Sequence, residues 1–200
     1  MEDKIIEKAT DLFLTYGFKS ITMDEIANNL GVSKKTIYKY FKNKTDLVKA
    51  VTTYLFENIS CGIDGICSQK MDPLDELFEI KKLVMIHLKD EKSSPQYQLQ
   101  RYYPEIYETL KHRQFHTMRD CVIENLNAGI KSGVYRENID VDFVSRIYFH
   151  GITGIKNSEM FPLKNHSMKT LMHHYLEYHL RGICTIKGIK QLEQQLKNQQ

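Results

Sequence analysis

The 200-residue chain has little proline, with four residues, and its four cysteines are scattered along it. The cysteines are Cys61, Cys67, Cys121 and Cys184. They do not form the close pairs of a zinc site or a disulfide framework, which favours reduced structural thiols. No apolar run approaches the roughly 18 residues of a membrane span. The start, Met1 to Lys4, lacks the basic-then-apolar order of a secretory signal, so we expect a cytoplasmic protein.

Signatures of catalysis are also missing from the sequence. It contains no Gly-rich phosphate loop, no Gly-x-Ser-x-Gly elbow and no His-Glu-x-x-His motif, so we predict no catalytic residues, no cofactor and no enzyme. His112 and His116 lie one helical turn apart, a spacing that can bind a metal. Because no convincing third ligand accompanies them, we predict no metal site.

Apolar residues recur mostly three and four positions apart, and alternation with a period of two is hard to find. This pattern predicts an all-α fold of about nine helices. Helix starts are indicated by Thr22, which forms a capping box with Glu25, and by the caps Asn43, Asp140 and Ser167. Further boundaries are expected at the following positions: Gly17, Gly62 and Gly65 as helix ends, Pro73 and Pro104 as starts, a polar loop from Asp90 to Pro95, and a frayed helical tail from Lys187.

The clearest functional pattern is a helix ending at Leu30, a turn at Gly31-Val32-Ser33, and a short helix from Lys34 to about Tyr40. This is the spacing of a helix-turn-helix, whose second helix can enter the major groove of DNA. The net charge of +3 is weak, but residues 31–45 carry five lysines and no acid. A local basic face of this kind can neutralise phosphates, although charge alone favours the alternative of a solvated lysine surface.

The residues in and around this pattern resemble the amino-terminal signature of the tetracycline-repressor (TetR) family, nearly without a break over residues 3–50. The resemblance rests on Phe18, Thr22-Met23-Asp24-Glu25-Ile26-Ala27, Gly31-Val32-Ser33, Thr36-Ile37-Tyr38-Lys39-Tyr40-Phe41, Asn43-Lys44 and Asp46-Leu47. It implies a DNA-binding domain over residues 1–48 and a helical dimerisation and effector-binding domain over residues 49–200. Family members are usually repressors that dimerise through their last two helices and leave DNA when a small molecule binds.

The resemblance and the helix geometry together identify candidate DNA-binding residues: Thr22, Ser33, Lys34, Lys35, Thr36, Tyr38, Tyr40 and Lys44. Thr22 could instead be a cap alone, the lysines could be merely solvated, and Tyr40 could pack. Most members have a small residue at the position of Lys35, so a long cation there could change the bases read. Ile37 and Phe41 are interpreted as core.

One short recognition helix reads few base pairs, so we expect a homodimer on a palindromic operator. Two wide apolar stripes near the carboxyl end predict the dimer interface, although packing within one chain is the alternative. The interface candidates are Phe143, Ile147, Gly151, Ile155, Leu171, Met172, Tyr175 and His179.

The middle of the chain is rich in aromatic residues, where the resemblance implies a pocket between helices. The candidates are Met85, Tyr102, Tyr103, Tyr107, Phe115, Met118 and Phe149, any of which could instead be core. We therefore predict a ligand-released repressor with a small apolar or aromatic effector. The alternative is a DNA-binding protein without an effector, whose larger domain serves only dimerisation or a protein partner.

Overall fold

The structure is a computed structural model that describes residues 1–89, 94–162 and 164–198. Within these ranges it contains ten α-helices and no β-strand, which confirms the all-α prediction. The helices are α1 (Glu2–Tyr16), α2 (Met23–Leu30), α3 (Lys34–Tyr38), α4 (Lys44–Cys67), α5 (Pro73–His87), α6 (Pro95–Tyr102), α7 (Pro104–Lys131), α8 (Val141–Gly154), α9 (Met168–Ile183) and α10 (Ile186–Asn198).

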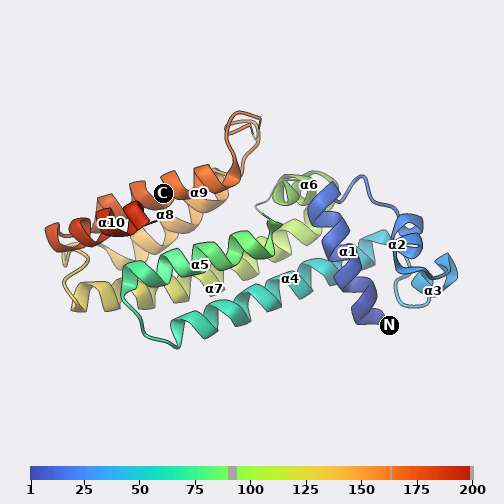
Figure 1. Cartoon of the computed structure of the whole chain (residues 1–200), viewed down its shortest axis with the longest axis horizontal. Coiled ribbons are helices and arrows are strands. Elements are labelled where there is room, and N and C mark those ends of the chain that lie inside the picture. The colour runs from blue at the N-terminus through green and yellow to red at the C-terminus, as the bar shows by residue number, and fades with distance from the viewer. Residues whose placement is uncertain (90–93, 163, 199–200) are drawn as a thin grey trace.

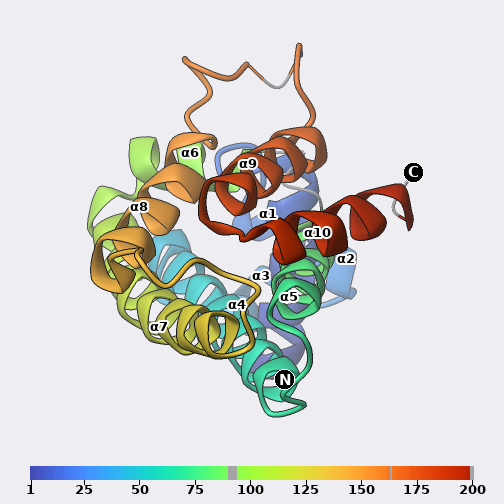
Figure 2. The ribbon, with the colours of Figure 1, turned by 90° about the vertical axis from the view of Figure 1, so that its left-hand side faces the viewer.

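The small helices α1 to α3 occupy one end of an elongated molecule, and α8 to α10 lie toward the other (Figure 1). The helices α4, α5 and α7 run lengthwise between them, and α4 packs against α1, α5 and α7. The view along the molecule shows α4, α5, α7, α8 and α9 arranged around a common centre (Figure 2). Helix α4 thus belongs to both ends of the molecule.

The predicted helix starts are confirmed by their caps. The Thr22 hydroxyl accepts a hydrogen bond from the Glu25 amide at 3.2 Å, and the Glu25 carboxylate accepts one from the Thr22 amide at 2.6 Å. Asn43, Asp140 and Ser167 accept similar bonds from the third residue of α4, α8 and α9. These bonds satisfy amides that a helix start otherwise leaves unpaired.

Several boundaries differ from the sequence prediction. Helix α3 ends at Tyr38, and α4 continues through Gly62 and Gly65 to Cys67. Glycine inside a helix lowers the stability of the helix by only about 1 kcal/mol, which packing can offset. At Gly62 there is also no room for a larger residue, because a Cβ there would lie 2.7 Å from Leu83 on α5. The close approach of α5 therefore accounts for one of the two glycines.

The carboxyl end also differs, because the helix that starts at Ser167 is not the last. Helix α9 ends at Ile183, and α10 follows after an isolated bridge between Tyr135 and Cys184. Leu192 of α10 is fully buried, so this helix is packed rather than frayed along that side. Of the predicted polar loop, residues 90–93 lie outside the described residues.

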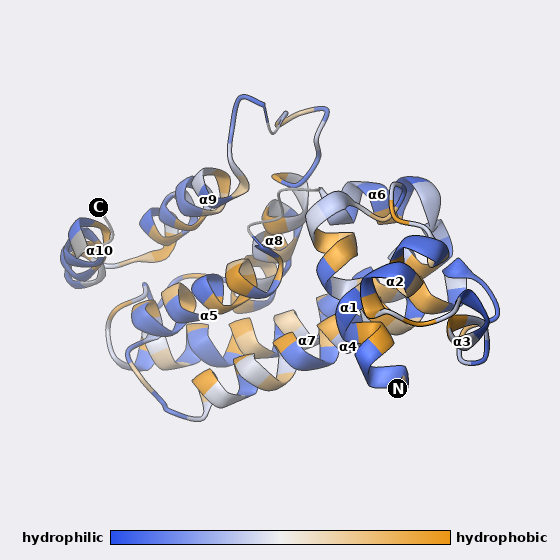
Figure 3. Cartoon of the chain, turned by 45° about the vertical axis from the view of Figure 1, so that its right-hand side comes forward, coloured by the Kyte–Doolittle hydropathy of each residue, from blue (hydrophilic) through white to orange (hydrophobic). Residues whose placement is uncertain are grey.

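Two large apolar cores hold these helices together. The first joins α1 to α4 and takes in Leu99 of α6 and Tyr107 of α7, whereas the second joins α5, α7, α8, α9 and α10. Apolar residues accordingly face inward and polar residues cover the outside (Figure 3). The predicted domain boundary at residues 48 and 49 falls within α4, and it stays a prediction.

Candidate DNA-binding surface and ligand cavity

The turn between α2 and α3 has the geometry that the sequence predicts. Gly31 adopts the left-handed conformation, with φ 65° and ψ 30°, which glycine enters without steric cost. The Val32 amide donates to the Ala27 carbonyl at 3.0 Å, and the Ser33 hydroxyl accepts from the Thr36 amide at 3.2 Å. The two helices are therefore fixed relative to each other by local hydrogen bonds.

The segment from Lys34 to Phe41, which comprises α3 and the turn after it, has one buried side and one exposed side. Ile37 is fully buried and Phe41 nearly so, which confirms their interpretation as core. Tyr38 and Tyr40 are 42% and 43% exposed, and Lys35 is also exposed. A helix of only five residues is unstable alone, so the buried Ile37 and Phe41 hold it in place.

Lys34 already has partners on the protein surface. Its ammonium lies 2.8 Å from the Asp24 carboxylate and 5.9 Å from the centre of the Tyr38 ring. The hydrogen bond to Asp24 raises the pKa of Lys34. Exposed ion pairs contribute little to stability, so a phosphate could replace Asp24 at little cost.

Thr22 and Lys44 have alternative partners as well. The Thr22 hydroxyl also donates to the Glu25 carboxylate, which lowers the pKa of Glu25 together with the bond from the Thr22 amide. The Lys44 ammonium donates to the Lys19 carbonyl at 3.3 Å, and burial lowers its pKa. In this conformation both residues support the local structure, and their contacts with DNA stay predictions.

A cavity of about 190 Å³ lies between the lengthwise helices. Five helices, α4, α5, α7, α8 and α9, form most of its wall, and Leu14 and Phe18 of the amino-terminal core close one part of it. Among the described lining residues there is no aspartate or glutamate. The cavity therefore suits an apolar molecule, and it reaches the amino-terminal core at Leu14 and Phe18.

Three of the seven predicted pocket residues, Tyr107, Met118 and Phe149, line this cavity. The other four do not. Met85 packs in a small cluster with residues of α9, and Tyr103 packs against the Phe18 ring. Tyr102 is exposed beside Lys19, and Phe115 stacks edge-on against Phe149 from the outer side.

The sequence analysis missed the wall contributed by α4. This helix presents Thr52, Leu55, Phe56, Ile59 and Ile63 to the cavity, and none of the five was among the predicted pocket residues. Their spacing of three and four is visible in the sequence, but the same spacing is typical of core residues. These side chains line a cavity, instead of packing in a core, because α4 is separated from α8 and α9.

A second, more polar cleft of about 460 Å³ adjoins the cavity. The two share Gln96, Tyr107, Lys111, Phe149, Thr153 and Lys156. Arg101, His150 and Asn157 also line the cleft, and Glu159 is the only acid among its described lining residues. The apolar cavity thus adjoins a cleft of mixed polar and apolar lining, in which most of the charged residues are cations.

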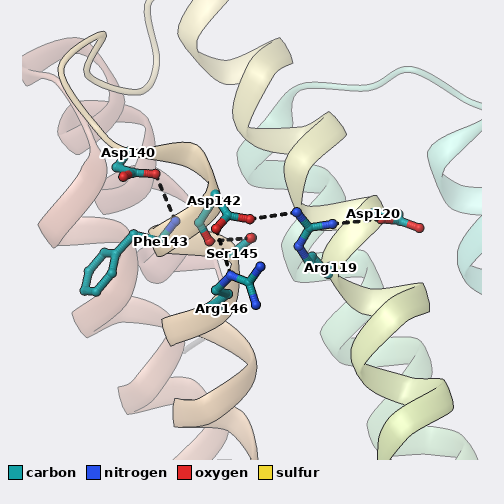
Figure 4. Close-up of polar contacts among 7 residues, drawn as sticks. All are labelled: Arg119, Asp120, Asp140, Asp142, Phe143, Ser145 and Arg146. Atoms are coloured by element: carbon teal, nitrogen blue, oxygen red, sulfur yellow. Dashed lines mark hydrogen bonds and ion pairs between the residues drawn. The ribbon is translucent and has the colours of Figure 1, made fainter.

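The residues predicted for a dimer interface fall into two groups. Phe143 and Ile147 of α8 are 62% and 44% exposed, and Tyr178 of α9, which was not predicted, is 78% exposed. At the start of α8, Phe143 lies on the side away from the network in which Arg119 and Arg146 bind Asp142 (Figure 4). These apolar side chains are therefore available on the surface of a single chain.

The second group is used within the chain. Ile155, Leu171, Met172 and His179 are buried. Gly151 accommodates the Tyr175 ring, and the Tyr175 hydroxyl donates to the Tyr148 carbonyl at 3.0 Å. These six residues therefore pack within one chain, as the alternative interpretation predicted. The interface between two chains stays a prediction.

Metal and membrane sites can be addressed for the described part of the chain. His112 and His116 approach within 3.3 Å between their Nε2 atoms, but no group of three potential ligands occurs among the described residues. Within the same ranges, no helix combines the length and apolar content that crossing a bilayer requires.

Comparisons with known proteins agree with this architecture. Residues 5–51 match the family model described as bacterial regulatory proteins, tetR family. The regulator YhgD of Bacillus subtilis is 42% identical over 60 residues, which span 30% of this chain and only 31% of YhgD. The repressor KstR2 of Mycolicibacterium smegmatis is 23% identical over 202 aligned positions, covering 94% of this chain and 93% of KstR2.

Solved structures share the whole fold. The regulatory protein TetR from Rhodobacter sphaeroides superposes with a TM-score of 0.73 at 16% identity, covering 90% of this chain and 97% of that one. SmeT, the repressor of a Stenotrophomonas maltophilia efflux pump, gives 0.64 at 18% identity over 93% and 91%. All these relatives are regulators, in agreement with the prediction that the chain is not an enzyme. Residues 5–51 thus form a helix-turn-helix domain of the tetR family of bacterial regulatory proteins, and the chain as a whole has the fold of transcriptional regulators of that family.

Proposed function

We propose that the protein is a repressor that binds a palindromic DNA operator as a homodimer and is released by a small, largely apolar effector. The observation that carries this proposal is the exposed, lysine-bearing side of α3, held in place by the buried Ile37. Its first residues, Ser33 to Thr36, would reach base edges, while Tyr38, Tyr40 and Lys44 would contact phosphates.

Two copies of α3 would double the number of base contacts, and the exposed apolar residues of α8 and α9 supply a means of pairing. Phe143 and Ile147 lie one turn apart, and Gly154 leaves open space where a partner helix could approach closely. Removing such side chains from water is favourable at about 25 cal/mol per Å². Of the predicted interface residues, the proposal keeps Phe143 and Ile147, and it adds Gly154 and Tyr178.

Release by an effector follows from the position of the cavity. One wall is α4, which begins beside the turn after α3 and is continuous over 24 residues. A ligand that needed α4 in another position would move it and change the separation of the two recognition helices. In support, the neighbour SmeT, which shares the fold, has been solved in complex with triclosan.

DNA selection from a random pool tests the central claim, because it reveals binding, palindromy and half-site spacing together. The double variant Lys34→Gln/Lys35→Gln should lose about tenfold or more in affinity and show a weaker salt dependence. The matched control, Lys131→Gln/Lys190→Gln, removes two exposed lysines from the far end and should bind normally. Enrichment of no sequence, or equal binding by both variants, would contradict the proposal.

Light scattering tests the dimer separately. Phe143→Glu/Ile147→Glu should yield monomers, because two carboxylates would be buried without partners at the interface. Ile86→Glu alters another exposed apolar side chain, 65% exposed on α5, and should leave the dimer intact. A monomeric unmodified protein would rule out the dimer, and a DNA-bound dimer that no candidate ligand releases would favour the effector-free alternative.

A further inference from the structure

The lining of the cavity and its adjoining cleft carries information about the charge of the effector. In the cavity itself three side chains are charged, Lys81, Lys111 and Lys156, and all three are cations. In the cleft, Arg101 joins Lys111 and Lys156, against the single acid Glu159. Over the described residues of both spaces, four cations therefore face one carboxylate.

The charges are not distributed evenly around the cavity. Lys111 of α7 and Lys156, two residues beyond α8, lie where the apolar cavity meets the polar cleft. Lys111 is 43% exposed in its side chain, so water reaches it, and its ammonium lies 4.0 Å from the exposed Glu108 carboxylate on the same helix. An exposed pair of this kind is weak, so an anionic head could displace Glu108. Lys81 of α5 lines only the cavity, where it lies 4.9 Å from the centre of the Phe78 ring.

A ligand matched to this surface has two unlike ends. An apolar body gains free energy by leaving water for the space between Phe56, Ile59 and Tyr148. An ionised head buried among the same side chains would lose its hydration without replacement, which is unfavourable. At the junction with the cleft, however, the head would keep contact with water and gain charge-assisted hydrogen bonds from lysine.

Resting on the proposed function, we infer that the effector is an amphipathic anion, with an apolar body in the cavity and a carboxylate or phosphate head at Lys111 and Lys156. The polar side chains beside them, Gln96 and Thr153, add neutral hydrogen-bonding groups for the same head. A cationic amphiphile of the same shape would instead meet like charges at the junction. The predicted effector is thereby refined from apolar or aromatic to apolar with one anionic end.

Three probes with the same chain and different heads test the charge directly. Dodecanoate, dodecanol and dodecyltrimethylammonium are titrated against the full-length protein below their micelle-forming concentrations, with binding followed by calorimetry. Dodecanoate should bind about tenfold or more tightly than the alcohol, a difference of about 1.4 kcal/mol, and the ammonium should bind no better than the alcohol. Equal affinities, or a preference for the ammonium, would overturn the inference.

A second arm places the head. Lys111→Gln/Lys156→Gln should remove the preference for dodecanoate and leave dodecanol binding unchanged, whereas Lys131→Gln/Lys190→Gln should change neither. Lys81→Gln should keep the preference, because Lys81 lines only the cavity. If Lys81→Gln abolishes the preference and the double variant does not, the assignment of the head to the cleft is wrong.

A third arm separates a carboxylate source from a phosphate source. Dodecanoyl-coenzyme A carries the same chain with phosphates at its far end, and its displacement of dodecanoate at equal or lower concentration would make a phosphate-bearing head the better match. Failure of dodecanoyl-coenzyme A to displace bound dodecanoate would favour a carboxylate. Both results support an anionic head, and binding of neither ligand overturns it.

DNA release is measured independently of ligand binding. If dodecanoate binds with the predicted preference but leaves the operator complex intact, the inferred anion site is supported and release by an effector is contradicted. Release of DNA by an uncharged or cationic compound, without any preference for dodecanoate, would retain the proposed function and reject the anion site.

Discussion

Between α1 and α3 the apolar side chains meet in a closed core, whereas between α4 and α9 similar side chains surround a cavity. Phe13, Ile26 and Ile37 are each fully buried in the first region. In the second, Phe56, Ile59 and Ile63 are only partly buried and face the cavity. This difference agrees with the proposed roles, in which the first region holds the DNA-binding surface in place and the second binds a small molecule.

The contrast predicts unequal costs for the same truncation. Ile37→Ala should destabilise the protein by about 2–5 kcal/mol, because it leaves a void in a closed core. Ile63→Ala should cost clearly less, because that side chain is only partly buried and already lacks neighbours on the cavity side. Urea unfolding of both variants provides the measurement, and equal losses would show that the cavity region is packed as tightly as the core.

The same contrast separates what sequence could predict from what it could not. The turn at Gly31 and the cap at Thr22 depend on residues within four positions of each other, so their chemistry is visible along the chain. The cavity depends on where long helices diverge. Periodicity along α4 does not show whether Phe56 contacts a neighbouring side chain or faces a cavity.

Misplaced residues follow the same reasoning. Met85 and Tyr103 are of the residue types that often line pockets. In the structure, however, Met85 packs against residues of α9, and Tyr103 packs against Phe18. Gly151 was assigned to close approach between two chains, yet the Tyr175 ring of the same chain fills the space beside it. Such contacts join residues more than 20 positions apart, and no local pattern specifies them.

A disulfide between α4 and α7 would sharpen the comparison by fixing one wall of the cavity. The Sγ atoms of Cys67 and Cys121 lie 3.4 Å apart, and a disulfide bond is about 2 Å long. Diamide would take one hydrogen from each thiol, becoming a hydrazine, and leave the two sulfurs bonded. Burial raises the pKa of both thiols, so the reaction should proceed faster in mildly alkaline buffer than at neutral pH.

The oxidised protein should be about 2–4 kcal/mol more stable, as seen by thermal unfolding, and should bind DNA but respond poorly to effector. Cys67→Ser treated with diamide serves as the control, since it retains Cys121 but cannot form this bond. An oxidised protein that still releases DNA normally would show that movement between α4 and α7 is not part of the response.

Acid should weaken the carboxyl-terminal region before the amino-terminal one. Burial against the Tyr148 and Tyr175 rings lowers the pKa of His179 to about 4, from an ordinary 6.5. Because the unfolded chain then binds the proton more readily, stability is complete above pH 6.5 and falls as pH decreases toward 4. The loss should reach at most about 3 kcal/mol.

Unfolding measured at several pH values checks this dependence. His179→Gln removes the titrating group, so its stability should change less between pH 6.5 and pH 4 than that of the unmodified protein. If both proteins show the same slope over this range, His179 is not the group responsible, and the carboxyl-terminal region has no special sensitivity to acid.

The smallest expected effects on stability come from removing two helix-capping hydroxyls, one in each region. Thr22 starts α2 and Ser167 starts α9, and each accepts a hydrogen bond from the third amide of its helix, at 3.2 Å and 3.1 Å. Thr22→Ala and Ser167→Ala should each cost about 1 kcal/mol of stability. Equal stability losses then make any difference in DNA binding attributable to the position of the hydroxyl rather than to unfolding.

If Thr22 also contacts a phosphate, Thr22→Ala should weaken operator binding several-fold at low salt, and Ser167→Ala should leave it unchanged. Glu25 complicates the contact, because its carboxylate holds both the hydroxyl and the amide of Thr22 and would repel a phosphate at the same helix start. Glu25→Gln keeps a hydrogen-bonding partner and removes the charge, so it should strengthen binding if the phosphate contact exists. Weaker binding by Glu25→Gln, together with equal binding by the two cap variants, would leave Thr22 as a cap alone.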